Sequence, residues 1–167
     1  MVPGFLVVMG VAGSGKTTVG RALASRLEWD FYDADDFHPP ANLAKMAAGI
    51  ALGDEDRAPW LATLHDLIAS CLARHTPGVL ACSALKEYYR QTLLAGNSGV
   101  EIVCLRGSYE LILPRMTART GHCMGAELLE SQFEDLEEPV DALKVDAGLP
   151  VDEIVETVVS YFGRRRP

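Results

Sequence analysis

The sequence predicts an α/β fold in which about five parallel strands form a sheet between two layers of helices. Short apolar runs alternate with amphipathic stretches along the chain, which is the pattern of a parallel sheet with helical crossovers. The 167 residues suit one compact domain with a single core, and no internal repeat or linker divides them. We therefore expect a single three-layer domain over residues 1–167.

Each expected strand is a short run followed by a helical pattern. The strands are Phe5–Met9, Asp30–Asp33, Val79–Cys82, Glu101–Leu105 and Leu143–Val145. The helical stretches are Lys16–Leu27, Asn42–Ala48, Pro59–Arg74, Lys86–Ala95, Tyr109–Arg119, Ala126–Leu136 and Val151–Phe162. Pro114 falls inside one of them. Because proline lacks an N–H and crowds the carbonyl four residues earlier, we expect a kink or a late helix start there.

Composition and charge exclude several classes of protein. The net charge of −8 argues against a nucleic-acid partner, because basic patches supply most of that affinity. No segment approaches the roughly 18 consecutive apolar residues of a membrane span, and the apolar start is too short for a signal peptide. The four cysteines lack metal-ligand spacing and fit reduced thiols. We expect a cytoplasmic protein without nucleic-acid or membrane partners.

A phosphate-binding loop is the clearest motif. Residues 10–17 read GVAGSGKT and match G-x-x-x-x-G-K-[ST] between an apolar strand and an amphipathic helix. Glycines let backbone N–H groups approach phosphate oxygens, and the helix N-terminus favours the anion. Lys16 is expected to reach the β- and γ-phosphates, and the Thr17 hydroxyl to ligate Mg²⁺. The residues predicted to bind the nucleotide are Gly10, Ala12, Gly13, Ser14, Gly15, Lys16, Thr17 and Thr18.

Acidic residues follow the second expected strand, which should end at the ligand crevice. Strand alternation would put Asp33 and Asp35 on one side of the chain. One of the two could hold Mg²⁺ through water, while the other orients an acceptor hydroxyl and takes its proton. The alternative is that these aspartates form only a solvated acidic turn; Asp36 is expected to be solvated in either case.

The loop occurs in switches, motors and kinases, so other features must decide among them. The guanine-reading Asn-Lys-x-Asp and the D-x-x-G sequence of GTPase switches are both absent. Arg115 and Arg119 lie four apart on one helical face, just before Gly121, where a lid could exclude water and neutralise phosphoryl charge. The alternative is a pair of solvated helix arginines. Together these features predict a P-loop kinase that uses ATP and Mg²⁺.

Residues 38–61 supply the candidate acceptor site between the second and third strands. Arg57 could make a bidentate pair with a carboxylate or phosphate, and His38 could bind a hydroxyl or carboxylate. These side chains predict an anionic acceptor rich in hydroxyl groups. The alternatives are that Arg57 pairs with Asp54 or Asp56 and that Trp60 is a core residue.

Four blocks of sequence resemble the gluconokinase family. Segment 38–61 resembles H-P-x-x-N-x-x-K-M-x-x-G-x-P-L-x-D-x-D-R-x-P-W-L, and 82–90 resembles C-S-A-L-K-x-x-Y-R. Residues 115–139 resemble the lid block R-x-x-x-R-x-G-H-F-M…S-Q-F-x-x-L-E-x-P, and the phosphate loop with Asp33-x-Asp35 completes the set. Ala34, Ala51 and Cys123 depart from a glycine, a proline and a phenylalanine of the family pattern.

The resemblance implies transfer of phosphate from ATP to the 6-hydroxyl of gluconate on the nucleoside-monophosphate-kinase-like fold that shikimate kinase shares. It implies an acceptor-binding insertion at about 36–61, a mobile lid at about 119–127 and a homodimer. The implied catalytic residues are Lys16, Asp35 and Arg119, and Arg115 is implied to bind the nucleotide. The implied acceptor contacts are Asp35, His38, Arg57, Lys86, Arg90 and His122; the implied metal ligands are Thr17 and Asp33.

Two alternatives stay open. A kinase of the same fold could phosphorylate another small acceptor, such as shikimate or a nucleoside monophosphate. A nucleotide-dependent sensor would have no acceptor at all, although the two aspartates and the arginine-bearing helix argue against it. The turn from Asp146 to Pro150 is the expected place for the adenine base.

Overall fold

The computed structural model describes residues 3–120 and 124–164, with the side chains of 119, 120, 124 and 125 left out. Five strands form one parallel sheet, as the sequence predicts, and their order is β2-β3-β1-β4-β5. Their bounds are β1 Phe5–Met9, β2 Asp30–Asp33, β3 Gly78–Ala81, β4 Val100–Arg106 and β5 Leu143–Asp146. The central strand β1 places Phe5 beside Gly78 of β3 and Val100 of β4.

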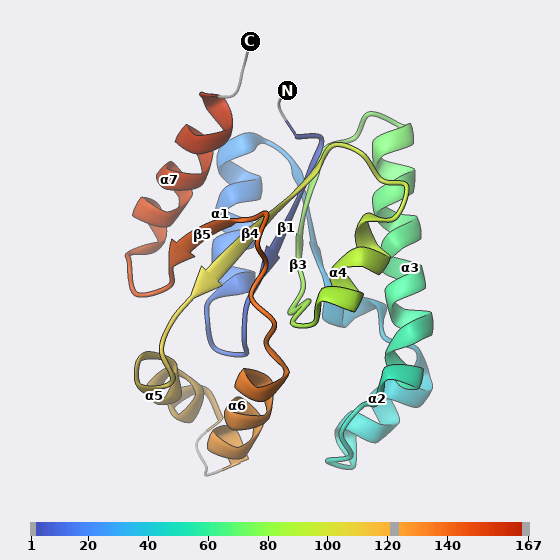
Figure 1. Cartoon of the computed structure of the whole chain (residues 1–167), viewed down its shortest axis with the longest axis vertical. Helices are drawn as coiled ribbons and strands as arrows, with labels where there is room; N and C mark the ends of the chain where they lie inside the picture. The colour runs from blue at the N-terminus through green and yellow to red at the C-terminus, as the bar shows by residue number, and fades with distance from the viewer. Residues whose placement is uncertain (1–2, 121–123, 165–167) are drawn as a thin grey trace.

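Helices cover both faces of the sheet (Figure 1). Helices α1 (Lys16–Leu27) and α7 (Val151–Gly163) pack on one face, and α3 (Asp54–Ala73) and α4 (Glu87–Leu94) on the other. Beyond the carboxyl ends of the strands lie α2 (Pro40–Ala47) on one side and α5 (Tyr109–Thr120) with α6 (Met124–Asp135) on the other. The expected three-layer architecture is therefore confirmed, and the two lobes flank the edge where ligands bind in such sheets.

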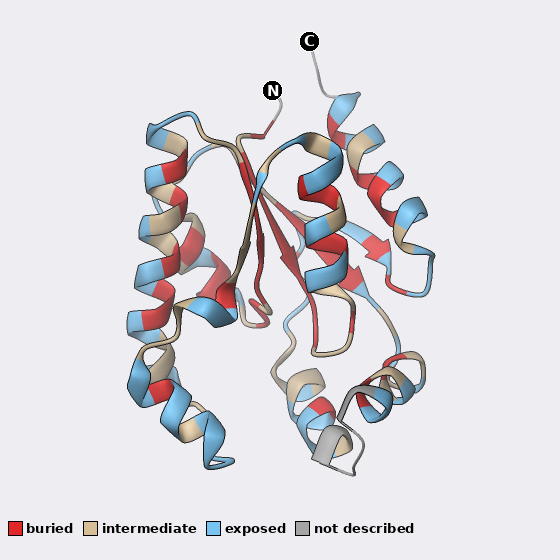
Figure 2. Ribbon diagram, turned by 180° about the vertical axis from the view of Figure 1, so that it is seen from behind, coloured by how far each residue is buried: buried red, intermediate tan, exposed pale blue. Residues whose placement is uncertain are grey.

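The core lies against both faces of the sheet (Figure 2). Strand β1 is buried throughout: Leu6 and Val8 face the α1–α7 layer, while Phe5, Val7 and Met9 face the α3–α4 layer. Burial on both faces explains why this strand reads as a continuous apolar run rather than an alternating one. It also gives the loop that follows β1 a rigid support.

Two helices contain a proline, and the position of each helix start bears on the expectations above. Helix α3 begins at Asp54 rather than Pro59, because the Asp56 carboxylate accepts the Gly53 N–H at 2.9 Å and closes the first turn. Helix α5 begins at Tyr109 and continues past Pro114, so the late start considered above is wrong. Each proline is exposed, and so is the residue four positions earlier, which leaves the unpaired carbonyl beside water.

Three of the four cysteines lie among the described residues. Cys71, Cys82 and Cys104 are buried free thiols, whereas Cys123 lies outside the described residues. Within residues 3–120 and 124–164, no helix combines the length and apolar character needed to cross a membrane.

Candidate active site

The phosphate loop joins β1 to α1 and depends on glycine at two positions. Gly15 caps α1 with φ 97° and Gly13 has φ 78°, a left-handed backbone that side chains disfavour. A Cβ on Gly13 would also lie 2.9 Å from Met116 Cγ of α5. The loop is thus held between the sheet and α5, with the N-terminus of α1 facing the crevice.

The loop residues differ in what they present to that crevice. Thr17 and Thr18 are exposed, and Lys16 folds back so that its Nζ donates to the Val11 carbonyl at 3.1 Å. Ser14, predicted to bind nucleotide, has a side chain buried at 1% exposure, and its N–H donates to Val11 at 3.2 Å. Its hydroxyl therefore lies beneath the loop rather than on the ligand face.

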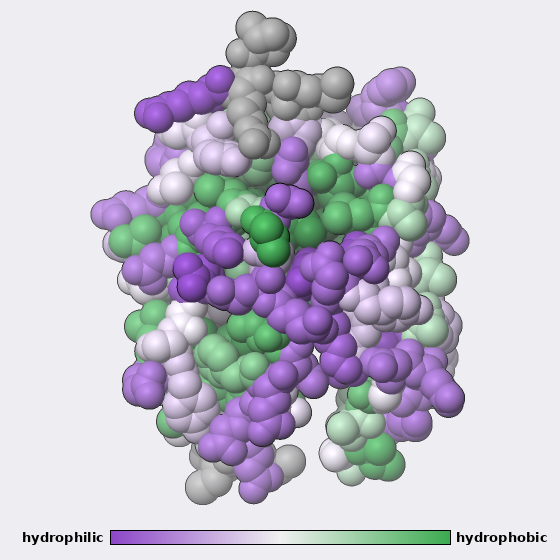
Figure 3. Space-filling model, in the orientation of Figure 1, coloured by the Kyte–Doolittle hydropathy of each residue, from purple (hydrophilic) through white to green (hydrophobic). Residues whose placement is uncertain are grey.

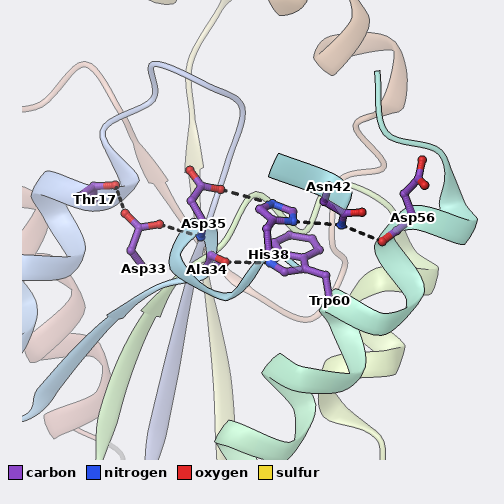
Figure 4. A network of polar contacts seen from close by, with 8 residues as sticks. All are labelled: Thr17, Asp33, Ala34, Asp35, His38, Asn42, Asp56 and Trp60. Atoms are coloured by element: carbon purple, nitrogen blue, oxygen red, sulfur yellow. Dashed lines mark hydrogen bonds and ion pairs between the residues drawn. The ribbon is translucent and has the colours of Figure 1, made fainter. Parts of the chain in front are cut away.

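Asp33 links the loop to the end of β2 (Figure 4). Its Oδ2 accepts from Thr17 Oγ1 at 3.2 Å, and its Oδ1 accepts the Asp35 N–H at 3.0 Å. The expected strand alternation at Asp35 is wrong, because Asp33 caps a 3₁₀ turn over Ala34–Phe37 and the pleat stops there. The turn, rather than the pleat, sets the direction of the Asp35 side chain.

The donor set at Thr17 and Asp33 fits a hard cation. A hydroxyl and a carboxylate oxygen are ligands that Mg²⁺ prefers, and Mg²⁺ usually binds through one or two protein groups, waters and substrate phosphates. No group of three or more acidic, histidine or cysteine side chains forms a metal cage in the part of the chain that the structure describes. Thr17 and Asp33 therefore suit a Mg²⁺ ion that binds together with the phosphates of a nucleotide.

Asp35 stands in the crevice beyond this pair. Its side chain is 78% exposed, yet the surrounding protein removes enough water to raise the pKa of the carboxyl, and the Asp33 carboxylate raises it further. His38 and Lys16 oppose that rise in the pKa. An accessible carboxylate with a raised pKa suits a general base for a hydroxyl.

A buried network supports Asp35 from residues 38–61, the candidate acceptor site, which we call the acceptor arm (Figure 4). The His38 ring stacks on Trp60 at 4.4 Å between centroids, and its Nε2 lies 3.8 Å from Asp35 Oδ1. Asn42 Nδ2 donates to the Asp56 carbonyl at 2.8 Å and lies 3.3 Å from His38 Nδ1. Because the Asn42 amide nitrogen is a donor, His38 Nδ1 must be the acceptor. A neutral His38 ring then carries its proton on Nε2, the nitrogen that faces Asp35.

His38 is therefore less available to an acceptor than the sequence predicted. Its side chain is 5% exposed. Burial lowers the pKa of the imidazole and the Arg57 charge lowers it further, while the Asp35 carboxylate opposes that fall. Trp60 is 4% exposed and donates to the Ala34 carbonyl at 2.7 Å, which confirms its core position.

Two cations face the crevice around one tyrosine. Arg57 Nη1 donates to the Tyr89 hydroxyl at 3.0 Å, and that hydroxyl donates to Asp54 Oδ1 at 2.6 Å. Lys86 Nζ lies 3.5 Å from the same Asp54 oxygen, and both cations lie over the Tyr89 ring. Asp56 pairs instead with Lys45 at 2.8 Å. Arg57 thus reaches Asp54 through Tyr89, which the sequence analysis did not assign to the site.

Arg90, predicted to contact the acceptor, is buried at 2% exposure. Its guanidinium donates to the carbonyls of Ala84, Leu85 and Glu137 and to the Glu87 carboxylate, at 2.6–2.9 Å. Ala84 has a positive φ of 45°, so these bonds hold a strained turn that carries Lys86 at its end. This placement contradicts the predicted contact and gives Arg90 a supporting role.

The lobe formed by α5 and α6 borders the phosphate loop. Ile112 and Met116 of α5 and Leu129 of α6 form an apolar cluster with Val11 of the loop. Arg115, next to Met116, is half-buried. The Arg119 side chain and His122 lie outside the described residues, so their predicted roles stay predictions.

The shape of the molecule leaves room for two ligands. Figure 3 shows the surface notched between the α2 lobe and the α5–α6 lobe; exposed Leu43, Met46 and Ile50 make the α2 side apolar. A cavity of about 430 Å³ adjoins the phosphate loop at the carboxyl end of β4, with walls that include Val11, Phe133 and Asp146. Asp146 begins the turn where the adenine base is expected.

Known proteins resemble the chain over nearly its whole length. A mouse protein named "Probable gluconokinase" is 49% identical over 154 residues, which cover 82% of this chain and 84% of the relative. The "Thermosensitive gluconokinase" of Escherichia coli K12 is 44% identical, with 90% and 82% covered. The crystal structure of a gluconokinase from Sinorhizobium meliloti 1021 superposes with a TM-score of 0.87 at 43% identity, covering 98% of this chain and 93% of that one.

The chain belongs to the gluconokinase family. A family model described as shikimate kinase also matches residues 12–158, as expected for a fold that the two families share. A solved shikimate kinase from Aquifex aeolicus is 19% identical with a TM-score of 0.62, which shows the fold alone. Membership of the gluconokinase family identifies the protein as a P-loop kinase and assigns the crevice between the two lobes as its candidate active site.

Proposed function

We propose that the protein transfers the γ-phosphoryl group of ATP to the 6-hydroxyl of D-gluconate, giving ADP and 6-phospho-D-gluconate. The position of Asp35 carries the proposal. Asp35 lies between the phosphate loop and the acceptor arm. Asp33 connects it to Thr17 of the loop by hydrogen bonds, and His38 of the arm lies beside its carboxylate. A sensor without an acceptor would have no use for a base there, whereas the relatives named gluconokinase favour gluconate over other acceptors.

The chain's own residues divide the work of transfer. Lys16 and the N-terminus of α1 bind the phosphates, and the N–H groups there orient them. Thr17, and Asp33 through water, would hold Mg²⁺, which would supply positive charge to offset that of the phosphates. Arg115 and Arg119 of α5 would neutralise the transferring group as the lid closes.

The acceptor reacts by in-line displacement. Asp35 accepts the proton of the 6-hydroxyl while the hydroxyl oxygen forms a bond to the γ-phosphorus. The bond between that phosphorus and the β,γ-bridging oxygen breaks at the same time, which releases ADP. The proton then passes from Asp35 to solvent. Arg57 and Lys86 would bind the carboxylate at the far end of gluconate, which fixes the end that reacts.

Acceptor-dependent ADP release tests the proposal. The purified protein with ATP and Mg²⁺ is assayed against D-gluconate, shikimate, AMP and no acceptor. Turnover that depends on gluconate alone supports the proposal; turnover with shikimate or AMP keeps the kinase but replaces the acceptor. ATP binding without acceptor-dependent turnover favours the sensor.

The family resemblance also supports a homodimer, and the composition of the chain supports a cytoplasmic location. Sedimentation equilibrium at micromolar concentration tests the oligomeric state: a mass of twice 18.1 kDa is expected, and a single-chain mass would contradict it. No part of the proposed transfer step requires a residue from a second copy.

A further inference from the structure

Gln132 of α6 makes a polar contact with the phosphate loop across 120 positions of sequence. Its side-chain Oε1 accepts the Ala12 N–H at 2.6 Å, and the contact is partly buried. The sequence shows Gln132 only as part of the S-Q-F block of the lid, with no role attached. Ala12 is the third residue of the loop motif, just before the glycines that wrap phosphate.

The contact completes the hydrogen bonding of one peptide unit. The carbonyl of the Val11–Ala12 peptide accepts from Lys16 Nζ at 3.1 Å and from the Ser14 N–H at 3.2 Å. The N–H of the same peptide donates to Gln132. Because a peptide unit is planar, fixing its N–H also fixes the direction of its carbonyl. Gln132 therefore sets the orientation of the group that holds Lys16.

Helix α6 is firmly anchored where it carries Gln132. The chain just after α6 is tied to the turn before α4, since Glu137 N–H donates to Leu85 at 2.9 Å and Arg90 Nη2 donates to the Glu137 carbonyl at 2.6 Å. Phe133, beside Gln132, packs on the apolar cluster of Val11, Ile112, Met116 and Leu129. Apolar packing is not directional, so the hydrogen bond is what orients the peptide.

We propose that Gln132 is a positioning residue for ATP binding. By holding the Val11–Ala12 peptide, it keeps the loop in the form in which the N–H groups that follow Ala12 are placed for the phosphates. The inference rests on the proposed function only in taking ATP as the nucleotide, and it does not depend on the identity of the acceptor. It predicts weaker ATP binding without Gln132 and an unchanged KM for the acceptor.

The substitution Gln132→Met tests the inference, because it keeps the length and apolar stem of the side chain but removes the acceptor. Loss of one hydrogen bond of this kind predicts a rise of about 3- to 10-fold in the Kd for ATP. The matched control is Gln91→Met, because Gln91 is the chain's other glutamine and lies exposed on α4. The control should leave the Kd unchanged.

Two measurements without acceptor decide the question. Calorimetry gives the Kd for ATP with Mg²⁺, and NMR-detected hydrogen exchange on ¹⁵N-labelled protein follows the Ala12 amide without nucleotide. Gln132→Met should weaken ATP binding and speed exchange at Ala12, and Gln91→Met should do neither. An unchanged Kd, or a raised Kd with unchanged Ala12 exchange, would overturn the inference. Failure of gluconate as the acceptor would affect neither measurement.

A second substitution guards against a change in folding. Gln132→Glu retains an oxygen that can accept the Ala12 N–H, so Ala12 should stay protected in this variant even if Gln132→Met unfolds. Rapid exchange at Ala12 in a folded Gln132→Glu protein would contradict the proposed contact.

Discussion

Thr17 Oγ1 donates to Asp33 Oδ2 at 3.2 Å and so connects the phosphate loop to the end of β2. The other Asp33 oxygen caps the turn that carries Asp35. One carboxylate therefore contacts both the proposed metal ligand of the loop, Thr17, and the backbone of the proposed base, Asp35. A change at Asp33 should disturb metal use and acceptor activation together.

Asp33→Asn should weaken the response to Mg²⁺. The amide cannot accept both the Thr17 hydroxyl and the Asp35 N–H, because only one of its two terminal atoms is an acceptor. Loss of such a supporting group typically costs about 10- to 100-fold in metal affinity or activity. Titrating turnover with Mg²⁺ should give a raised apparent constant; a titration identical to that of the unmodified protein would refute the assignment of Asp33.

Asp36→Asn should extend activity to lower pH. Asp35 must be ionised to accept a proton, and desolvation and the neighbouring Asp33 and Asp36 charges raise the pKa of that carboxyl. Removing the Asp36 charge lowers the pKa of Asp35, so the acid limb of kcat/KM moves to lower pH. Asp152→Asn, an exposed change on α7, serves as the control and should leave the limb in place. If Asp36→Asn leaves the acid limb of kcat/KM in place or moves it to higher pH, Asp35 is not the base.

Tyr89→Phe should raise the KM for gluconate by about 3- to 10-fold, the effect of losing one or two hydrogen bonds. The hydroxyl orients Arg57 and links it to Asp54, while the ring that both cations cover remains. The KM for ATP should not change. Tyr88→Phe is the matched control, since Tyr88 is the adjacent tyrosine and is 62% exposed. If the two variants have the same KM for gluconate, Tyr89 does not contribute to the acceptor site.

Arg90→Met should lower the free energy of unfolding by about 3–5 kcal/mol, because it leaves buried groups without partners. The carbonyls of Ala84, Leu85 and Glu137 all accept from Arg90. Arg26→Met removes an exposed ion pair with Glu156, at 53% and 59% side-chain exposure, and should cost at most about 1 kcal/mol. Urea unfolding compares the two; equal losses would show that Arg90 is not a structural residue.

Local sequence patterns were sufficient for most of the fold. The apolar runs predicted β1, β3 and β4, because parallel strands buried on both faces need continuous apolar sequence, whereas the edge strands β2 and β5 are only partly buried and less apolar. The start of α3 was misjudged because Pro59 suggested a first turn, whereas the contact between Gly53 and Asp56 starts the helix earlier.

The site was less accessible to sequence reasoning because burial and partners depend on tertiary structure. Arginine in a candidate site suggests an anion ligand, but Arg90 is enclosed by carbonyls from segments far apart in the chain. Tyr89 and Gln132 carry no charge, and the sequence blocks that contain them attach no role to either, so only their contacts reveal them. The phosphate loop was readable because its chemistry is contained in consecutive residues.

The identity of the phosphorylated product tests the central claim most directly. The protein is incubated with ATP, Mg²⁺ and D-gluconate, and ³¹P NMR follows the products. The account predicts ADP with an equal amount of a phosphate monoester whose phosphorus couples to the two protons on carbon 6 of gluconate. Loss of ATP to free phosphate alone, or an ester on a different carbon, would contradict it.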